Sequence, residues 1–250
     1  MNDHRLSQFF HGKIARFYKV VILIAMFSLM SQPALANNGK PRLWPPDSRP
    51  YGKTYSQWSA NWWKYVLSFP ASSSPLNDAT GENCGDGQSG QVFFLVGTTG
   101  GTAVRNECVV PPGKSIFFPI IDFVCAVPED GNTAQEIMDL CSFVTDYVDL
   151  VEVTVDGMPV PNLLAENRFP SPIFSYTGAV DNPFDTSCSG RPAGECYEGF
   201  HDTAFADGYY VMLRPLPPGE HQIKFKGHLF IPEWGWEFGD EIIYNITVGH

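Results

Sequence analysis

Basic residues are scarce in this sequence. Its 250 residues include 16 lysines and arginines against 27 aspartates and glutamates, a formal net charge of -11. Charged residues make up 17% of the chain, below the roughly 25% of an average globular protein. The shortage of positive charge argues against binding to nucleic acid or to anionic lipid, and we expect neither partner.

The sequence also lacks an apolar run long enough to cross a membrane. Its most apolar stretch, residues 20–30, covers 11 residues, whereas a spanning helix needs about 20. Basic residues precede this stretch and the small residues Ala34 and Ala36 follow it, which is the three-part pattern of a secretory signal peptide. We therefore expect residues 1–36 to be removed by cleavage after Ala36. The product would be secreted or periplasmic, with no stable membrane anchor, because no cysteine near the cleavage point could accept a lipid.

No C-x-x-C pair occurs, which argues against a thioredoxin-like redox site or a zinc ribbon. All six cysteines follow the predicted signal peptide, and an even number of cysteines in an exported chain indicates structural disulfides. Other connectivities remain open, but pairing between neighbours along the chain ties each loop to the element beside it. The predicted pairs are Cys84 with Cys108, Cys125 with Cys141, and Cys188 with Cys196.

Two segments have the pattern of amphipathic helices. Thr54 can cap the first, in which large apolar residues recur at three- and four-residue spacing until Pro70. We expect the aromatic side chains on that stripe to pack against a sheet, with ligand stacking as the alternative. Thr133 and Glu136 have the spacing of a capping box at the start of a second, short helix.

Most of the remaining chain reads as short strands separated by turns. The 23 glycines and 21 prolines favour many turns. Dense apolar runs indicate buried strands, and alternation of apolar and polar residues indicates strands with one buried face. Such segments include residues 91–96, 115–122, 151–155, 221–226 and 242–248. Asp156-Gly157 is a strong signal for a hairpin turn.

These patterns predict an all-β fold, either an antiparallel β-sandwich or a jelly roll, stabilised by disulfides. One N-terminal amphipathic helix and one short helix would accompany the strands. Residues 37–53 contain four prolines and are expected to form an extended arm on the surface. Residues 54–250 are then expected to form a single β-rich domain.

One stretch, residues 58–105, contains a Trp-rich helix after Trp58, a polar loop with Asn77-Asp78, Gly81, Cys84, Gln88 and Gly90, and an apolar strand that ends at Gly97. This combination resembles a group of secreted bacterial proteins that have no assigned activity. The Pro-Gly-Glu-His turn within residues 216–225 is similar to the closing hairpin of such chains. This resemblance implies export, and it assigns a function to no residue.

No catalytic motif is present. Residues 87–91 approach the nucleophile elbow G-x-S-x-G, but Gln91 replaces its second glycine. The densest cluster of acids and histidine is His201, Asp202 and Asp207, which we expect in one loop. An imidazole beside carboxylates could serve in general acid–base catalysis or hold a divalent metal. The alternative is that these are exposed, turn-forming residues.

A second acidic group lies around Cys84. Asp78, Glu82 and Asp86 offer oxygens that a calcium ion could accept, although their order does not match the EF-hand loop. A solvated acidic loop explains the same residues. We expect no cofactor, and calcium and zinc are the ions to test.

Three large aromatic residues, Trp234, Trp236 and Phe238, are spaced by two and would share one face of a strand. Such a face could be part of the core. If it met solvent, Trp234 and Trp236 could form a platform on which sugar rings stack.

Two functions remain compatible with these features. The first is an exported, non-enzymatic β-domain that binds a glycan or an extracytoplasmic protein. The second is a secreted hydrolase that uses the His201 loop, with or without a bound metal. A pair of carboxylates facing one cleft would favour the hydrolase, since glycoside cleavage needs two carboxyl groups about 5 to 10 Å apart.

Overall fold

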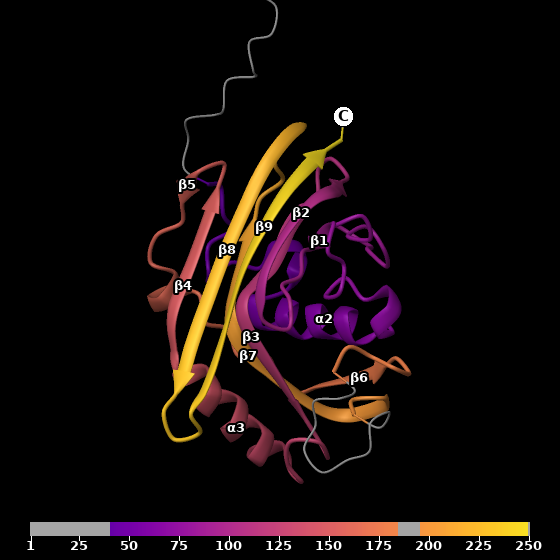
Figure 1. Ribbon diagram of the computed structural model, residues 1–250, viewed down its shortest axis with the longest axis vertical. Coiled ribbons are helices and arrows are strands. Elements are labelled where there is room, and N and C mark those ends of the chain that lie inside the picture. Colours follow the sequence, from indigo (N-terminus) through magenta and orange to yellow (C-terminus); the bar gives the residue numbers. More distant parts are fainter. Residues whose placement is uncertain (1–40, 185–195, 250) are drawn as a thin grey trace, which may run out of the picture. The chain divides into compact units, whose positions relative to one another are not determined.

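Two β-sheets and the helices beside them make up the described part of the chain, which comprises residues 41–184 and 196–249 of a computed structural model (Figure 1). The predicted signal peptide, residues 1–36, and Cys188 lie outside these residues. Within them, no helix is long and apolar enough to cross a membrane.

The described residues contain nine strands, three α-helices and two 3-10 turns. The α-helices are α2 (Tyr55–Leu67), α3 (Ala134–Asp146) and the single turn α4 (Leu163–Glu166), and the 3-10 turns are Pro50–Gly52 and Ala71–Ser73. The strands are β1 (Val92–Phe94), β2 (Gly101–Val110), β3 (Ser115–Ala126), β4 (Val148–Val155), β5 (Met158–Pro159), β6 (Phe174–Gly178), β7 (Gly199–Leu213), β8 (Gly219–Ile231) and β9 (Trp236–Val248).

The strands form one four-stranded and one five-stranded sheet. The first has the order β1-β3-β7-β6 and the second the order β2-β9-β8-β4-β5. The fold is therefore β-rich, as predicted. The expectation of purely antiparallel pairing is wrong, because β1 runs parallel to β3 and β2 runs parallel to β9. Both parallel pairs join strands that a two-residue turn cannot connect, and such pairing leaves no local signal in the sequence.

The four-stranded sheet is covered on both faces. On β3, Phe117 points toward helix α2 and its neighbour Phe118 points toward the five-stranded sheet, where its ring lies 4.9 Å from that of Phe225. Figure 1 shows α2 beside this sheet, on the side away from β8. The layers are therefore helix, sheet and sheet, and strands β3 and β7 lie in the middle layer.

Helix α2 begins where the sequence places it. Thr54 and Gln57 form a capping box, in which the Thr54 hydroxyl accepts the backbone N–H of Gln57 at 3.2 Å and the Gln57 amide oxygen accepts that of Thr54 at 3.0 Å. This pairing satisfies two backbone donors at the helix end. Its aromatic stripe packs on the four-stranded sheet, as predicted.

Helix α3 is longer than the predicted short helix, with 13 residues, the same length as α2. Thr133 caps it by accepting the backbone N–H of Glu136 at 3.2 Å. The disulfide between Cys125 and Cys141 ties α3 to the end of β3, and this predicted pair is confirmed.

The second predicted disulfide, between Cys84 and Cys108, is also confirmed and joins the loop before β1 to strand β2. The predicted pair of Cys188 with Cys196 stays a prediction, because Cys188 lies outside the described residues. The described part of the N-terminal arm follows β7, with Leu43 bridged to Leu213 and the Trp44 backbone N–H donating to Met212 at 2.9 Å.

Candidate functional site

A cleft of about 550 Å³ is bounded by helix α2, strand β3, strand β9 and the loop after β1. We call it the aromatic cleft. Its described aromatic lining residues are Trp62, Trp63, Phe123, Phe184, Tyr197, Trp236 and Phe238. Two carboxyl groups, those of Asp122 and Asp240, also line it. Its volume falls in the range of small-ligand sites, about 300 to 1,000 Å³.

The cleft lies where one edge of β3 loses its neighbour. Strand β1 pairs with β3 only from Ser115 to Phe117. Beyond that point the chain after β1 leaves the sheet, and residues 119–124 of β3 line the cleft. The open edge lets the space beside α2 continue into the space between the two sheets.

Helix α2 supplies two indole rings that meet edge to face at 5.0 Å, those of Trp62 and Trp63. The Trp62 indole N–H donates to the backbone oxygen of Leu95 at 2.9 Å, which holds the helix against the chain that follows β1. The Trp63 indole N–H lies near the Asp122 carboxyl but makes no hydrogen bond in the described part of the chain, although it is buried. A buried donor without a partner costs stability, so a group that accepted this N–H would stabilise the site.

Strand β9 supplies the second aromatic wall. Trp236 and Phe238 lie two residues apart on one face of the strand, and their rings lie 6.1 Å and 5.7 Å from that of Phe123 on β3. The Trp236 side chain is 37% exposed, so part of its ring meets solvent at the cleft.

Asp122 lies on β3 opposite Gly208 of β7. Its carboxylate accepts the Tyr210 hydroxyl at 3.0 Å. Burial raises the pKa of Asp122 well above its usual value, and repulsion by Asp240 adds to the rise, while the Tyr210 hydrogen bond opposes it. Burial therefore favours the protonated form of the Asp122 carboxyl, which can donate a hydrogen bond.

Asp240 occupies a core position of β9, in phase with the buried Ile242 and Tyr244. Burial raises its pKa to about 7, against the opposing effects of the Thr98 backbone N–H and of the Arg105 guanidinium. One of its oxygens, Oδ1, is buried and accepts no hydrogen bond from the described residues. Both the unpaired oxygen of Asp240 and the unpaired N–H of Trp63 thus belong to lining residues of the same cleft.

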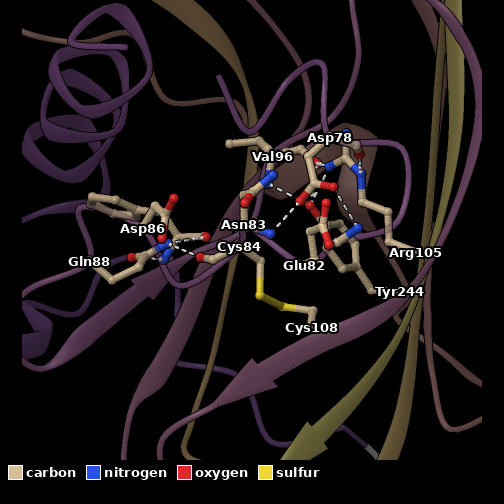
Figure 2. The surroundings of a disulfide bond; sticks show 12 residues. Asp78, Glu82, Asn83, Cys84, Asp86, Gln88, Val96, Arg105, Cys108 and Tyr244 are labelled. Atoms are coloured by element: carbon tan, nitrogen blue, oxygen red, sulfur yellow. Dashed lines mark hydrogen bonds between the residues drawn. A yellow bond between two sulfur atoms is a disulfide. The ribbon is translucent and has the colours of Figure 1, made fainter. Parts of the chain in front are cut away.

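Arg105 is a buried cation near the disulfide between Cys84 and Cys108 (Figure 2). Its guanidinium donates to four backbone oxygens, those of Asp78 at 2.8 Å, Leu76 at 3.3 Å, Val96 at 2.6 Å and Gly97 at 2.9 Å, and to the Tyr244 hydroxyl. These bonds fix the loop segments on both sides of β1. Arg105 therefore positions the loop that forms one wall, and it makes no ion pair with Asp240 among the described residues.

This arrangement suits a polar ligand that also presents apolar faces. Ring walls pack against C–H groups, and the two carboxyls and the Trp63 N–H offer hydrogen bonds. No lysine, arginine or histidine is among the described lining residues. The cleft is accordingly unsuited to an anionic ligand.

The two predicted platform residues are separated in the structure. Trp236 lines the aromatic cleft, whereas Trp234 lies in the turn between β8 and β9, where its ring contacts Phe143 of α3 at 5.1 Å. The expectation of three rings on one strand face therefore holds only for Trp236 and Phe238. The Trp234 side chain is 52% exposed.

The predicted His201 loop is instead part of a strand, because β7 begins at Gly199. His201 stacks on Tyr176 at 4.7 Å and its Nε2 lies 2.8 Å from Glu129. Asp207 lies six residues further along the strand, which corresponds to roughly 20 Å, and it pairs with Arg168 at 2.8 Å. Asp202 is exposed, so these three residues do not converge on one site.

The three acidic residues around Cys84 do not form a cluster either. Asp78 accepts the backbone N–H groups of Gly81 at 2.8 Å and Asn83 at 2.9 Å, so its carboxylate shapes the loop. Figure 2 shows Asp86 beside Gln88, on the other side of Cys84 from Asp78. In residues 41–184 and 196–249 no group of three or more potential metal ligands was found.

Sequence reasoning missed Asp122 and Asp240. Asp122 is the only carboxylate of β3, whereas β9 also contains Glu237 and Glu241, and neither Asp122 nor Asp240 belongs to a motif. The available signal was the alternation of buried and exposed residues along β9, because Asp240 falls on the same alternate positions as Ile242, Tyr244 and Ile246. A lone carboxylate at a core position of a strand is unusual and indicates either a buried partner or a ligand.

Comparison with known proteins assigns neither a family nor a function. No family model and no curated protein matches the chain. One matching solved structure bears the description "Structure of PbICP-C in complex with falcipain-2". It is 10% identical, covers 64% of this chain and 99% of its own, and has a TM-score of 0.21. A likeness at this level carries no argument, and the resemblance to secreted bacterial proteins stays a prediction.

Proposed function

We propose that this protein is an exported β-sandwich domain that binds a carbohydrate in its aromatic cleft and catalyses no reaction on it. The observation that carries this proposal is the lining of the cleft, which combines aromatic rings from α2, β3 and β9 with the carboxyl groups of Asp122 and Asp240. Sugar hydroxyls both donate and accept hydrogen bonds, so a sugar ring can pair with the carboxyl groups while its C–H faces meet the aromatic rings.

The aromatic walls support the same ligand class. The C–H faces of a sugar ring stack on indole and phenyl rings, and Trp236 presents its ring partly to solvent. Two confirmed disulfides support a place outside the reducing cytoplasm, and export is the corresponding part of the proposal. An extracytoplasmic protein that presents such a group would be an alternative partner.

The test is a comparison of two tryptophan variants in glycan binding. Purified protein is screened against immobilised glycans, and the affinity for each bound glycan is then measured by calorimetry. We expect Trp236→Ala to weaken binding at least tenfold, because a stacking ring is removed from the cleft. Trp234→Ala is the matched control, since it removes an indole that is also exposed but does not line the cleft. Equal affinities for the two variants, or no binding of any glycan by the wild type, would contradict the proposal.

The two carboxyl groups in one cleft also favour a second candidate, glycoside hydrolysis. That reaction needs one carboxylic acid and one ionised carboxylate. Burial raises the pKa of both Asp122 and Asp240, which disfavours the ionised carboxylate that this reaction needs, so binding is the better-supported function. Release of reducing sugar by the wild type, lost in both Asp122→Asn and Asp240→Asn, would establish the hydrolase instead.

A further inference from the structure

The geometry points to a ligand that carries a protonated amine, so that the aromatic cleft selects amino sugars with a free ammonium group over their N-acetylated counterparts. This inference rests on the proposed function and names the ligand class for the same site. It starts from the charges of the lining residues, which include two carboxyls and no described basic side chain.

Asp240 lines the cleft, and one of its carboxyl oxygens has no hydrogen-bond partner among the described residues. Its Oδ1 is buried and accepts no hydrogen bond from the described residues, and the side chain is 8% exposed. The other oxygen faces Gly97, where a Cβ would lie 2.7 Å from it. An ammonium group has three N–H donors, so it can donate a hydrogen bond to Oδ1 and pair with the negative charge of the carboxylate at the same time.

The protein itself provides no direct counter-ion for Asp240 in its described residues. The charged or titratable groups that face it are Asp122 from β3 and Arg105 from β2. Asp122 is of the same sign. Arg105 directs its N–H groups to backbone oxygens and to the Tyr244 hydroxyl. In the absence of a cationic ligand, a proton therefore neutralises the Asp240 carboxyl, and a cationic ligand can replace it.

The rings of the cleft favour the same charge. A cation within about 6 Å of an aromatic ring centre is attracted to its face, and the attraction is strongest for tryptophan. Trp63 and Trp236 are both lining residues of the cleft. The chain beyond the predicted signal peptide has 12 basic and 26 acidic residues, a formal charge of -14, which also attracts cations.

Binding of the ammonium form exchanges one cation for one proton. The Asp240 carboxylic acid releases its proton to solvent, and the resulting carboxylate pairs with the ammonium, which keeps its own protons. Because burial raises the pKa of Asp240 to about 7, the group holds its proton at pH 6 and can release close to one proton per ligand. A neutral ligand would release none.

The experiment compares a β-1,4-linked glucosamine trisaccharide with its N-acetylated form. Titration calorimetry is run on the purified protein at pH 6, in two buffers with different ionisation enthalpies, so that proton release is measured directly. We expect the trisaccharide with free amines to bind at least tenfold more tightly and to release close to one proton. Asp240→Asn should lose both effects, and Asp202→Asn, which changes an exposed carboxylate on β7, should retain them.

Proton release on the wild type needs no variant, so a failure of Asp240→Asn to fold leaves the test intact. Equal binding of the two trisaccharides without proton release would overturn the inference and leave carbohydrate binding standing. Binding of neutral glycans alone would likewise overturn the inference and leave carbohydrate binding standing. If no glycan binds, both the inference and the proposed function fail.

Discussion

Asp240 titrates near neutral pH because it is buried on a strand without a direct ion pair among the described residues. Its pKa is raised from an ordinary 3.8 to about 7. Between these values the folded protein holds a proton that the unfolded chain has released, so the free energy of unfolding falls as the pH rises from about 4 to about 7. The full penalty, on the order of 4 kcal/mol, is present above pH 7.

We predict that Asp240→Asn removes this penalty. The amide has nearly the same shape and carries no charge, so the variant should match the wild type below pH 4 and exceed its stability above pH 7. Denaturant unfolding at pH 4, 6 and 8 measures the difference. Asp202→Asn controls for the loss of one exposed negative charge, and the same pH dependence in wild type and Asp240→Asn would refute the prediction.

At the scale of elements, the two sheets approach each other closely beside the aromatic cleft. Gly227 of β8 faces β3 of the other sheet, where a Cβ would lie 2.6 Å from the Ile121 Cβ and 2.9 Å from the Ile120 backbone oxygen. Only a residue without a side chain fits there. The contact sets the spacing between β3 and β9, which carry Asp122 and Asp240.

We predict that Gly227→Ala destabilises the protein by about 1 to 3 kcal/mol, because the added methyl group forces the sheets apart. Denaturant unfolding of the purified variant checks this value. Gly85→Ala is the matched control, since its Cβ would meet no atom within 4 Å, and we expect it to change stability by less than about 0.5 kcal/mol. An equal effect at the two positions would contradict a specific contact between the sheets.

Elements with local signals could be predicted from the sequence. Thr54 and Thr133 mark the starts of α2 and α3, and Asp156-Gly157 forms the turn between β4 and β5 with the positive φ angles that such a turn requires. The start of β7 could not be predicted, because the polar residues His201 and Asp202 resemble a loop. They are accommodated there by pairing with β6, which is a non-local contact.

The candidate site was less predictable than the fold. Trp236 could be identified from its spacing to Phe238, but whether the ring meets a cleft depends on where β9 packs. Asp122 and Asp240 come together only through the packing of two sheets, and no local pattern encodes that meeting. Packing also decides that Trp234 contacts α3 instead of a ligand site.

At the scale of the whole molecule, helix α3 packs against strands β3 and β7 and is joined to the end of β3 by a disulfide. The disulfide between Cys125 and Cys141 closes a 16-residue separation, which corresponds to about 3 kcal/mol of stabilisation in the chain-entropy account. No described residue of α3 lines the aromatic cleft. A loss of stability around helix α3 should therefore leave ligand binding in the cleft unchanged.

We predict that replacing Cys125 and Cys141 together by alanine lowers the free energy of unfolding by about 2 to 5 kcal/mol and leaves the cleft formed. Hydrogen exchange should show loss of protection in α3, and glycan affinity should stay within about twofold of the wild type at a temperature below the transition. Undiminished protection of α3, or loss of binding in protein that is still folded, would contradict this separation.

The parallel pairing of β2 with β9 determines when the larger sheet can be completed. Asn106 and Asn245, which are 139 residues apart, are joined side chain to side chain across this pair. At a synthesis rate of about 5 to 20 residues per second, β2 waits roughly 7 to 28 s for its partner to leave the ribosome. During that interval β2 has an unpaired edge that can associate with strands of other chains. Protection of this edge before β9 is made therefore matters as much as the pairing that stabilises it in the folded protein.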